Sequence, residues 1–529
     1  MNAHEIAELE DRTAGDAGVV WDSRVIGPRT PGWSRCEIAF VVALTLFVVV
    51  AATWRLGVPS FWNDEAATWG ISGHGFADVV NVLRVSDGDR GAALYYAVVH
   101  VWVGVFGTTE VAFRSLSVIA AGATIPAFYA VGRRLVARTA ATAAAVLLAT
   151  SPFFLTYARD ARTYAVATFM VVLATLAFLR ALETGTVADW TVYTLVAAVS
   201  VYFHWFAALV VLAQFVSLLS VGPHRIPLRR VITSAAVLTL LMSPIAILVL
   251  FGSRGGVEWI APLSVAGLKS LATRLIGTTD WLGRLLYFMV LVAGSVAAVR
   301  IARRNRASPA VNIGALALTW FVVPIGATLA ISAFKPVLVP RYLIVALPGF
   351  ALLLGLGLTY LVRGRSALLA AGVVAFVIVG ASGYGPVWSA SPYGENWRDI
   401  TRVIAQRAAP TDAVVVFPAS AVFAVSYYAH NQAALDARTG PLWPPVTWDT
   451  PFSHVPSDPT SVTAVARASV AVVWLVVREP RGRAAQDPVA GTSALRALQR
   501  ELLGRFPNHV QIAQFKHDRV VLVRYSAGP

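Results

Sequence analysis

Long uninterrupted runs of apolar residues occupy most of the chain before residue 387. A helix needs about 20 apolar residues to cross a bilayer. Eleven segments meet or approach this length, and we expect each to form a spanning helix: residues 38–57, 111–131, 139–156, 162–181, 188–203, 205–221, 231–251, 282–301, 311–333, 342–361 and 366–386. A twelfth apolar segment, 92–107, is shorter and carries Tyr95, Tyr96, His100 and Trp102, which suit a helix at the membrane surface as well as one that crosses it.

Clusters of basic residues between these segments predict which way the chain crosses. Loops on the cytoplasmic side carry an excess of Lys and Arg. Clusters follow the second, sixth, eighth and tenth segments: Arg133, Arg134 and Arg138; His224, Arg225, Arg229 and Arg230; Arg300, Arg303, Arg304 and Arg306; and Arg363 and Arg365. All of these clusters lie on one side only if 92–107 does not cross. We therefore expect eleven spans in a multi-pass plasma-membrane protein, with the N-terminus in the cytoplasm and the C-terminus outside.

After residue 387 the apolar runs shorten and polar residues return. Asn396–Arg407 has helical spacing, Ala413–Phe417, Val470–Val477 and Val510–Tyr525 are typical of strands, the last as a hairpin turning near His517 and Asp518, and Pro441–Pro459 is a proline-rich loop. We expect a cytoplasmic tail over 1–36, a transmembrane domain over 37–386 with a large first outer loop over 58–110, and an extracytoplasmic α/β domain over 387–529. The predicted fold class is a polytopic α-helical membrane protein with a C-terminal α/β domain.

The composition supports this class. Hydrophobic residues make up 57% of the 529 residues and charged residues 13%, which is about half the charged fraction of an ordinary soluble protein. The formal charge of +15 does not indicate nucleic-acid binding, because the arginines gather in short clusters between apolar segments. The single cysteine, Cys36, excludes an internal disulfide and a cysteine metal cluster.

Two adjacent carboxylates, Asp64 and Glu65, lie just beyond the first spanning segment. Carboxylates this close to a membrane are costly to desolvate and are therefore candidates for chemistry. A carboxylate beside an apolar wall can have a raised pKa and accept a proton from a hydroxyl group. The competing interpretation is structural, since a carboxylate pair at the start of a helix over Ala66–Ile71 would be stabilised by the helix dipole.

Charged residues also gather where other segments end on the same predicted surface. Asp160 stands between Arg159 and Arg162, and is a candidate second site carboxylate beside two phosphate-binding arginines. The alternative for this turn is interfacial placement with an internal ion pair. Lys335 and Arg341 run against the positive-inside trend, so they indicate either a bound lipid phosphate or a salt bridge to one of the acids.

Three further residues carry weaker signals. Arg90, next to Asp89, is a candidate for the same phosphate, although a solvated loop pair is the more common explanation. His74 and His204 are lone histidines, which are more often structural hydrogen-bonding groups than metal ligands. The residues do not decide whether a divalent metal ion takes part.

The order of several short motifs resembles a known group of enzymes. The Asp-Glu pair is followed by Leu94-Tyr95-Tyr96 with His100-Val101-Trp102, Phe113-Arg114-Ser115-Leu116-Ser117, Gly132-Arg133-Arg134-Leu135, Ser151-Pro152-Phe153-Phe154, Tyr157-Ala158-Arg159-Asp160-Ala161-Arg162-Thr163-Tyr164 and Arg341-Tyr342-Leu343. Over about residues 38–400 the chain resembles the GT-C superfamily of polyprenyl-phosphate-sugar-dependent glycosyltransferases. The branch it resembles most is glycosyltransferase family 39, that of protein O-mannosyltransferases and lipid A aminoarabinose transferases.

The resemblance implies an enzyme that moves a sugar, of the mannose or arabinose type, from a polyprenyl-phosphate donor to a hydroxyl acceptor of the cell envelope. It implies inversion at the anomeric carbon, with Asp64 as the base, Glu65 as its neighbour and Asp160 as the second acidic residue. By the same resemblance Arg341 would lie near the donor phosphate, and Arg114 matches an arginine that begins the second span in this group. The positions of Tyr342, Arg159, Arg162, Lys335 and Arg90 make them further candidates for that phosphate, and Tyr157 and His204 are further site candidates. Membrane lipids and the acceptor are the expected partners, and nucleic acid is not.

Two positions depart from the family pattern. Asp89-Arg90 stands where many relatives have His-Pro-Pro or Lys-Pro, which leaves the acceptor type open, and Asp160 stands where relatives often have the longer Glu. Two other function classes also stay open. A flippase or transporter for a lipid-linked sugar would normally show charges within its spans and paired half-structures, whereas here the charges lie at span ends. A catalytically inactive scaffold whose outer domain binds a partner is the third interpretation.

Overall fold

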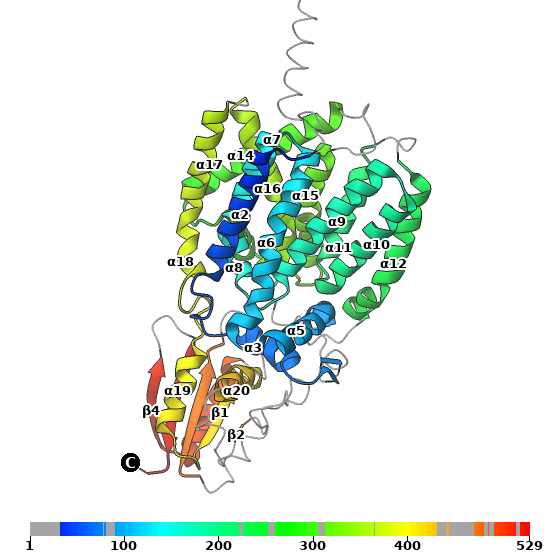
Figure 1. Cartoon of the computed structure of the whole chain (residues 1–529). Coiled ribbons are helices and arrows are strands. Elements are labelled where there is room, and N and C mark those ends of the chain that lie inside the picture. Colours follow the sequence, from blue (N-terminus) through cyan, green and yellow to red (C-terminus); the bar gives the residue numbers. More distant parts are fainter. Residues whose placement is uncertain are drawn as a thin grey trace, which may run out of the picture.

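A helical bundle and a smaller sheet region form the molecule, with the sheet at one end of the bundle (Figure 1). The computed structural model describes residues 32–77, 79–80, 90–221, 226–251, 260–304, 313–363, 365–430, 442–443, 470–480, 485, 491–514 and 519–528. The expected N-terminal tail (mostly), the proline-rich loop and the turn near His517 and Asp518 lie outside these residues.

The bundle contains a helix for each of the eleven expected spans. They are α2 (Arg35–Thr53), α6 (Glu110–Leu135), α7 (Arg138–Ala149) with α8 (Pro152–Ala158), α9 (Tyr164–Thr184), α10 (Val187–Phe203), α11 (Ala207–Leu218), α12 (Leu228–Phe251), α14 (Trp281–Arg304), α15 (Ile313–Ser332), η5 (Pro340–Ala346) with α16 (Leu347–Leu361), and α17 (Ser366–Gly380) continuing through η6 (Ala381–Gly383) and α18 (Tyr384–Val387). Within the described residues, 8 helices are long and apolar enough to cross a membrane, or 9 with the bent pair α7–α8. The predicted fold class is thus confirmed, while the sidedness of the termini stays a prediction.

The first loop folds into short helices beside the sheet. Residues 92–107 form α5 (Ala93–Phe106), preceded by the short η1 (Arg90–Ala92), and α3 (Asn63–Ser72) packs nearby. Figure 1 shows α3 and α5 at the end of the bundle next to the sheet. A helix of 14 residues is about 21 Å long, shorter than the hydrocarbon core of about 30 Å. A further helix, α13 (Val265–Ile276), lies between the expected spans 231–251 and 282–301, and we did not predict it.

The expected span 139–156 is broken into α7 and α8, which meet at an angle of 56°. Pro152 stands at the first position of α8, where its missing N–H costs nothing, but it cannot continue α7. The Ser151 side chain accepts a hydrogen bond from the Phe154 backbone N–H and so caps α8. The apolar pattern alone concealed this break, although the proline is visible in the sequence.

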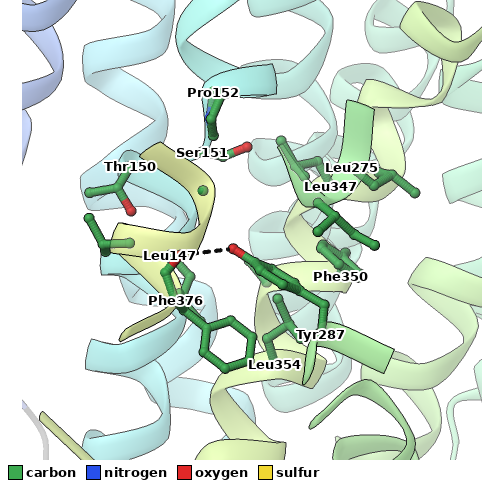
Figure 2. Close-up of a pocket in the computed structure, with 14 residues that line it drawn as sticks. Leu147, Thr150, Ser151, Pro152, Leu275, Tyr287, Leu347, Phe350, Leu354 and Phe376 are labelled. Carbon is green, nitrogen blue, oxygen red and sulfur yellow. Dashed lines mark hydrogen bonds between the residues drawn. The ribbon is translucent and has the colours of Figure 1, made fainter. Parts of the chain in front are cut away.

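A small cavity lies beside the break, between α7, α14, α16 and α17 (Figure 2). Its volume is about 20 Å³, room for a single water molecule and too little for an isoprenoid chain. On its wall the Tyr287 hydroxyl donates to the Phe376 carbonyl oxygen at 3.3 Å, which ties α14 to α17.

Glycines allow α14 to approach its neighbours at backbone distance. A Cβ atom on Gly294 would lie 1.9 Å from the Leu353 carbonyl oxygen of α16, and one on Gly357 would lie 2.1 Å from the Val290 carbonyl oxygen. Small residues of this kind let helices pack closely within a membrane, where contact rather than the hydrophobic effect holds them together.

The C-terminal region is a five-stranded sheet in the order β2-β1-β3-β5-β4. The strands are β1 (Ala413–Phe417), β2 (Leu442–Trp443), β3 (Val472–Arg478), β4 (Asn508–Gln514) and β5 (Val520–Ser526). β1 is parallel to β2 and β3, whereas β5 is antiparallel to β3 and β4. The predicted helix and strands are therefore present, with the helix as α19 (Trp397–Arg407).

The two faces of this sheet bury alternate residues of β1. Val414 and Val416 face a core that also contains Trp69 of α3 and Phe423 of α20 (Val422–His430). Ala413, Val415 and Phe417 face α23 (Thr492–Arg505). Because the core of the first face includes residues of the first loop, the sheet packs directly onto the segment that carries Asp64 and Glu65.

We expect Gly294→Ala to lower the thermal stability of the purified protein, because the added methyl group meets a backbone carbonyl that cannot move aside. Overpacking of this kind costs about 1–3 kcal/mol. The matched control is Gly326→Ala on α15, where an added Cβ meets nothing within 4 Å. Melting temperatures in detergent measure both, and an equal effect of the two substitutions would contradict the role given to the α14–α16 contact.

Candidate active site

Asp64 and Glu65 occupy the first turn of α3, so the helix start that the structural interpretation required is present. Successive side chains leave an α-helix about 100° apart, so the two carboxylates have different surroundings. Glu65 is buried, whereas 23% of the Asp64 side chain is exposed. Asp64 is thus the accessible member of the pair.

Glu65 is bound through both carboxylate oxygens. Arg114 of α6 donates from Nε to Oε1 at 2.7 Å and from Nη2 to Oε2 at 2.5 Å, and the Ala161 backbone N–H donates to Oε1 at 2.8 Å. Arg114 also donates to the carbonyl oxygens of Leu56 and Pro59. Glu65 and Arg114 therefore join α3, α6 and the turn after α8, and they hold the site together from inside.

Asp64 faces Arg341 of η5. The Arg341 Nη2 atom lies 3.2 Å from Asp64 Oδ2, and both side chains remain partly exposed. Arg341 also donates from Nε to the Tyr164 hydroxyl at 2.8 Å, and its guanidinium lies 5.5 Å from the centre of the Trp62 ring. This pair is an accessible carboxylate beside an oriented guanidinium.

Arg162 lies on the other side of Asp64. Its Nη1 atom donates to the Asp64 backbone carbonyl at 3.1 Å and to the Tyr96 hydroxyl of α5 at 3.0 Å. Arg162 thus fixes the backbone of α3 against α5, and it adds a second positive charge near the Asp64 carboxylate.

Asp160 is buried behind Asp64. It accepts hydrogen bonds from the Trp62 indole at 3.0 Å and from the Tyr393 hydroxyl at 3.4 Å. Burial raises the pKa of the Asp160 carboxyl well above its usual range, and the charge of Glu65 raises it further. These contacts orient Trp62, whose ring stacks on Tyr393 at 4.2 Å on one side and meets the Arg341 guanidinium.

Arg159, a predicted phosphate ligand, has other partners in the structure. Its guanidinium donates to the carbonyl oxygens of Ala51, Ala52, Trp54 and Arg55 at the carboxyl end of α2. Such carbonyls lack partners within their own helix. Burial, together with the positive charges of Arg114 and Arg55, lowers the pKa of Arg159 to about 10. Arg159 is therefore a helix-capping residue, and it takes no part in the site we describe.

An aromatic cluster lines the site on the side of η5. Tyr164 lies 4.8 Å from Tyr157 and 6.3 Å from Tyr342, and His204 lies 5.2 Å from Tyr342, all measured between ring centres. His204 Nδ1 accepts from the Phe206 backbone N–H at 3.2 Å. Burial and the nearby arginines lower the pKa of His204 to about 3, so its ring is neutral at physiological pH.

Two predicted phosphate ligands remain, Lys335 and Arg90. The Lys335 side chain is exposed after the end of α15. The backbone of Arg90 begins η1, but its side chain lies outside the described residues. Within the part of the chain that the structure describes, no three His, Cys, Asp or Glu side chains come together as metal ligands.

The C-terminal region binds the backbone that leads into α3. Glu395 accepts from the Asn63 backbone N–H at 2.8 Å, and its other oxygen accepts from Arg478 of β3 at 2.7 Å. The Tyr428 hydroxyl of α20 accepts from the Phe61 backbone N–H at 2.7 Å. Residues from both parts of the chain thus fix the first turn of α3.

Sequence reasoning missed Trp62, Tyr393 and Glu395 as site residues. A signal existed for Glu395, because it is the first acidic residue after Asp280. Trp62 and Tyr393 carry no comparable signal, since aromatic residues are frequent at membrane surfaces. Their contacts join segments that are distant in the sequence.

We expect Arg114→Gln to destabilise the protein strongly, because it leaves Glu65 buried without its partner. Removing one member of a buried pair costs about 3–5 kcal/mol. Arg402→Gln is the control, since Arg402 pairs with Asp399 on the exposed face of α19 and such pairs contribute less than about 1 kcal/mol. Thermal unfolding in detergent compares the two, and equal melting temperatures would refute the central role of the buried pair.

Comparison with known proteins supports the resemblance deduced from the sequence. Residues 92–249 match the family model described as dolichyl-phosphate-mannose-protein mannosyltransferase. None of the curated protein sequences compared with the chain matches it. The family match thus covers α5 to α12, which contain Arg114, Asp160 and Arg162 but not Asp64 or Arg341.

Solved structures extend the likeness to nearly the whole chain. ArnT from Cupriavidus metallidurans in the apo state is 14% identical, with a TM-score of 0.56 over 93% of this chain and 100% of that one. The same protein bound to undecaprenyl phosphate is 16% identical, with a TM-score of 0.56 over 93% and 98%. The oligosaccharyltransferase of Archaeoglobus fulgidus, in complex with Zn and sulfate, is 13% identical, with a TM-score of 0.54 over 91% and 73%.

At these identities the structural likeness establishes a shared fold. The family-model match adds a likeness in sequence over the helices that surround the site. Taken together, the two findings show that residues 92–249 resemble a mannosyltransferase family and that the chain shares its fold with ArnT and the archaeal oligosaccharyltransferase.

Proposed function

We propose that the chain transfers a sugar from a polyprenyl phosphate to a hydroxyl acceptor at the outer membrane surface, with Asp64 as the general base. The observation that carries this proposal is the partly exposed Asp64–Arg341 pair, 3.2 Å apart at the end of the bundle. It offers a proton acceptor beside a cation for a phosphate. The fold-related ArnT in complex with undecaprenyl phosphate supports this class of donor.

The proposed reaction is a single displacement. The acceptor hydroxyl oxygen attacks the anomeric carbon, the bond from that carbon to the phosphate oxygen breaks, and the polyprenyl phosphate leaves with the electron pair. The hydroxyl proton passes to the Asp64 carboxylate, and the configuration at the anomeric carbon inverts. A phosphate is a good leaving group, so cations that stabilise its charge serve better than a general acid.

Asp64 and Arg341 are the two groups proposed to meet the substrates, and neighbouring residues position them. Arg341 is the proposed phosphate ligand, since its guanidinium is held by Tyr164 and Trp62 while Nη2 remains beside Asp64. Arg162 holds the backbone of Asp64 and adds positive charge. Glu65 and Asp160, both buried, act as positioning residues rather than as reacting groups.

The sugar is proposed from the likeness alone. The matched family model is that of a mannosyltransferase, which favours mannose, and an arabinose-type sugar is the second choice. Side chains around Asp64 do not distinguish the two. A panel of polyprenyl-phosphate sugars would therefore identify the donor.

We expect Asp64→Asn to reduce transfer by at least about a hundredfold, because general base catalysis contributes about 10²–10⁴-fold. The protein should still fold, since Asp64 is partly exposed. Asp399→Asn on the exposed side of α19 is the matched control and should retain activity. Transfer of radiolabelled sugar in membranes measures the effect. Full activity of Asp64→Asn would refute its role, and no transfer by the wild type from any donor would favour the transporter or scaffold interpretation.

We expect Glu395→Gln to lower kcat about tenfold or more with little change in donor affinity, because it weakens the anchor on the first turn of α3 while Arg341 stays in place. Glu501→Gln on the exposed side of α23 is the control. Steady-state kinetics with varied donor separates kcat from KM. An equal loss in both variants, or a change in KM alone, would contradict a positioning role for Glu395.

A further inference from the structure

An open groove runs between α14 and α15 on the surface of the bundle, with a volume of about 530 Å³. Its lining is apolar and includes Val292, Val296 and Val322, which are 44%, 39% and 50% exposed. Arg300 and Arg303 line its end near the carboxyl terminus of α14. An apolar groove that ends at two guanidinium groups is complementary to a lipid with a negatively charged headgroup.

In the part of the chain that the structure describes, the positive charge at this end has no acidic partner. The sequence contains no Asp or Glu between Asp280 and Glu395, a stretch that includes α14 to α18 entire. Among the described residues, Arg300 contacts the Tyr360 hydroxyl and ring, and neither Arg300 nor Arg303 forms an ion pair with a carboxylate. A phosphate would supply the missing negative charge, and guanidinium groups bind phosphate through paired donors.

The length of the groove matches one leaflet of a bilayer. Leu291 and Arg303 mark its ends along α14, a distance of twelve residues or about 18 Å. Half of a hydrocarbon core is about 15 Å. The acyl chains of a single glycerophospholipid would therefore lie along the groove while its phosphate reached Arg300 and Arg303.

The sugar donor does not fit this position. Arg300 contacts Tyr360 at the far end of α16, whereas Arg341 precedes the start of that helix. Tyr360 lies nineteen positions after Arg341 along η5 and α16, which corresponds to about 30 Å. The phosphate of a donor bound at Arg341 would therefore be too far from Arg300 to contact it.

We propose that this groove binds one anionic glycerophospholipid from the leaflet remote from the candidate active site, with its phosphate held by Arg300 and Arg303. The lipid would fill the space between α14 and α15 and neutralise the arginine end of α14. This inference does not depend on the proposed glycosyl transfer, since it concerns the opposite end of the bundle.

The test uses the full-length protein, delipidated in detergent and titrated with phosphatidylglycerol while native mass spectrometry counts bound lipids. We expect one phosphatidylglycerol to bind tightly, and phosphatidylcholine to bind at least about tenfold more weakly, since it carries no net charge. Arg300→Gln/Arg303→Gln should lose this preference. Arg363→Gln/Arg365→Gln, which removes the same charge from exposed positions outside the groove, should keep it.

A second variant tests the apolar part of the groove. Val296→Trp places a large ring in the channel from an exposed position, so folding should be unaffected while lipid binding falls. Equal affinities of the wild type and the Arg300→Gln/Arg303→Gln variant would overturn the proposal. Displacement of the bound phosphatidylglycerol by undecaprenyl phosphate in the wild type but not in that variant would also overturn it, because the groove would then belong to the donor.

Discussion

The buried ion pair between Glu65 and Arg114 is the constraint on which the candidate site depends. Two charges that are 1% and 3% exposed have given up almost all contact with water, so each requires the other. Their bidentate geometry sets the rotation of α3 about its own axis. Because Glu65 points inward, Asp64 must point toward the opening and Arg341. The buried position of Glu65 thus determines the exposed position of Asp64.

The C-terminal region completes the same constraint from outside the bundle. Arg398 of α19 pairs with Glu110 at the start of α6 at 2.5 Å and donates to the carbonyl oxygen of Val58. Glu395 binds the Asn63 backbone N–H. The segment before α3 is therefore held between the helical bundle and the C-terminal region. Residues from both parts of the chain thus contribute to the candidate site.

Much of the fold could be predicted because its signals are local. Apolar runs predicted the helices of the bundle, of which 8 or 9 are long and apolar enough to span a membrane among the described residues, and the short β-branched runs predicted strands such as Ala413–Phe417. The break before Pro152 was missed because the span 139–156 was predicted from the length of its apolar run, without regard to the proline within it. Sequence reasoning also placed Asp64, Arg162 and Arg341 on one surface, and the structure brings them together.

Which residues of the site are accessible and which are buried could not be predicted in the same way. Asp64 and Glu65 are adjacent and chemically alike, and they differ in their contacts: Glu65 binds Arg114 and the backbone of Ala161, whereas Asp64 faces Arg341. The position of Arg159 beside Asp160 predicted a phosphate ligand, yet its guanidinium donates hydrogen bonds to carbonyl oxygens at the end of α2. These outcomes depend on contacts between distant segments, which neither periodicity nor spacing records.

The ion pair between Asp64 and Arg341 has a kinetic consequence. While it persists, the Asp64 carboxylate and the Arg341 guanidinium occupy one another, so neither is free to meet a substrate. On the proposed mechanism, a donor phosphate competes for Arg341 and so releases Asp64. Asp64 would then be free to accept a proton only after the donor has bound, which imposes an order of binding, donor before acceptor.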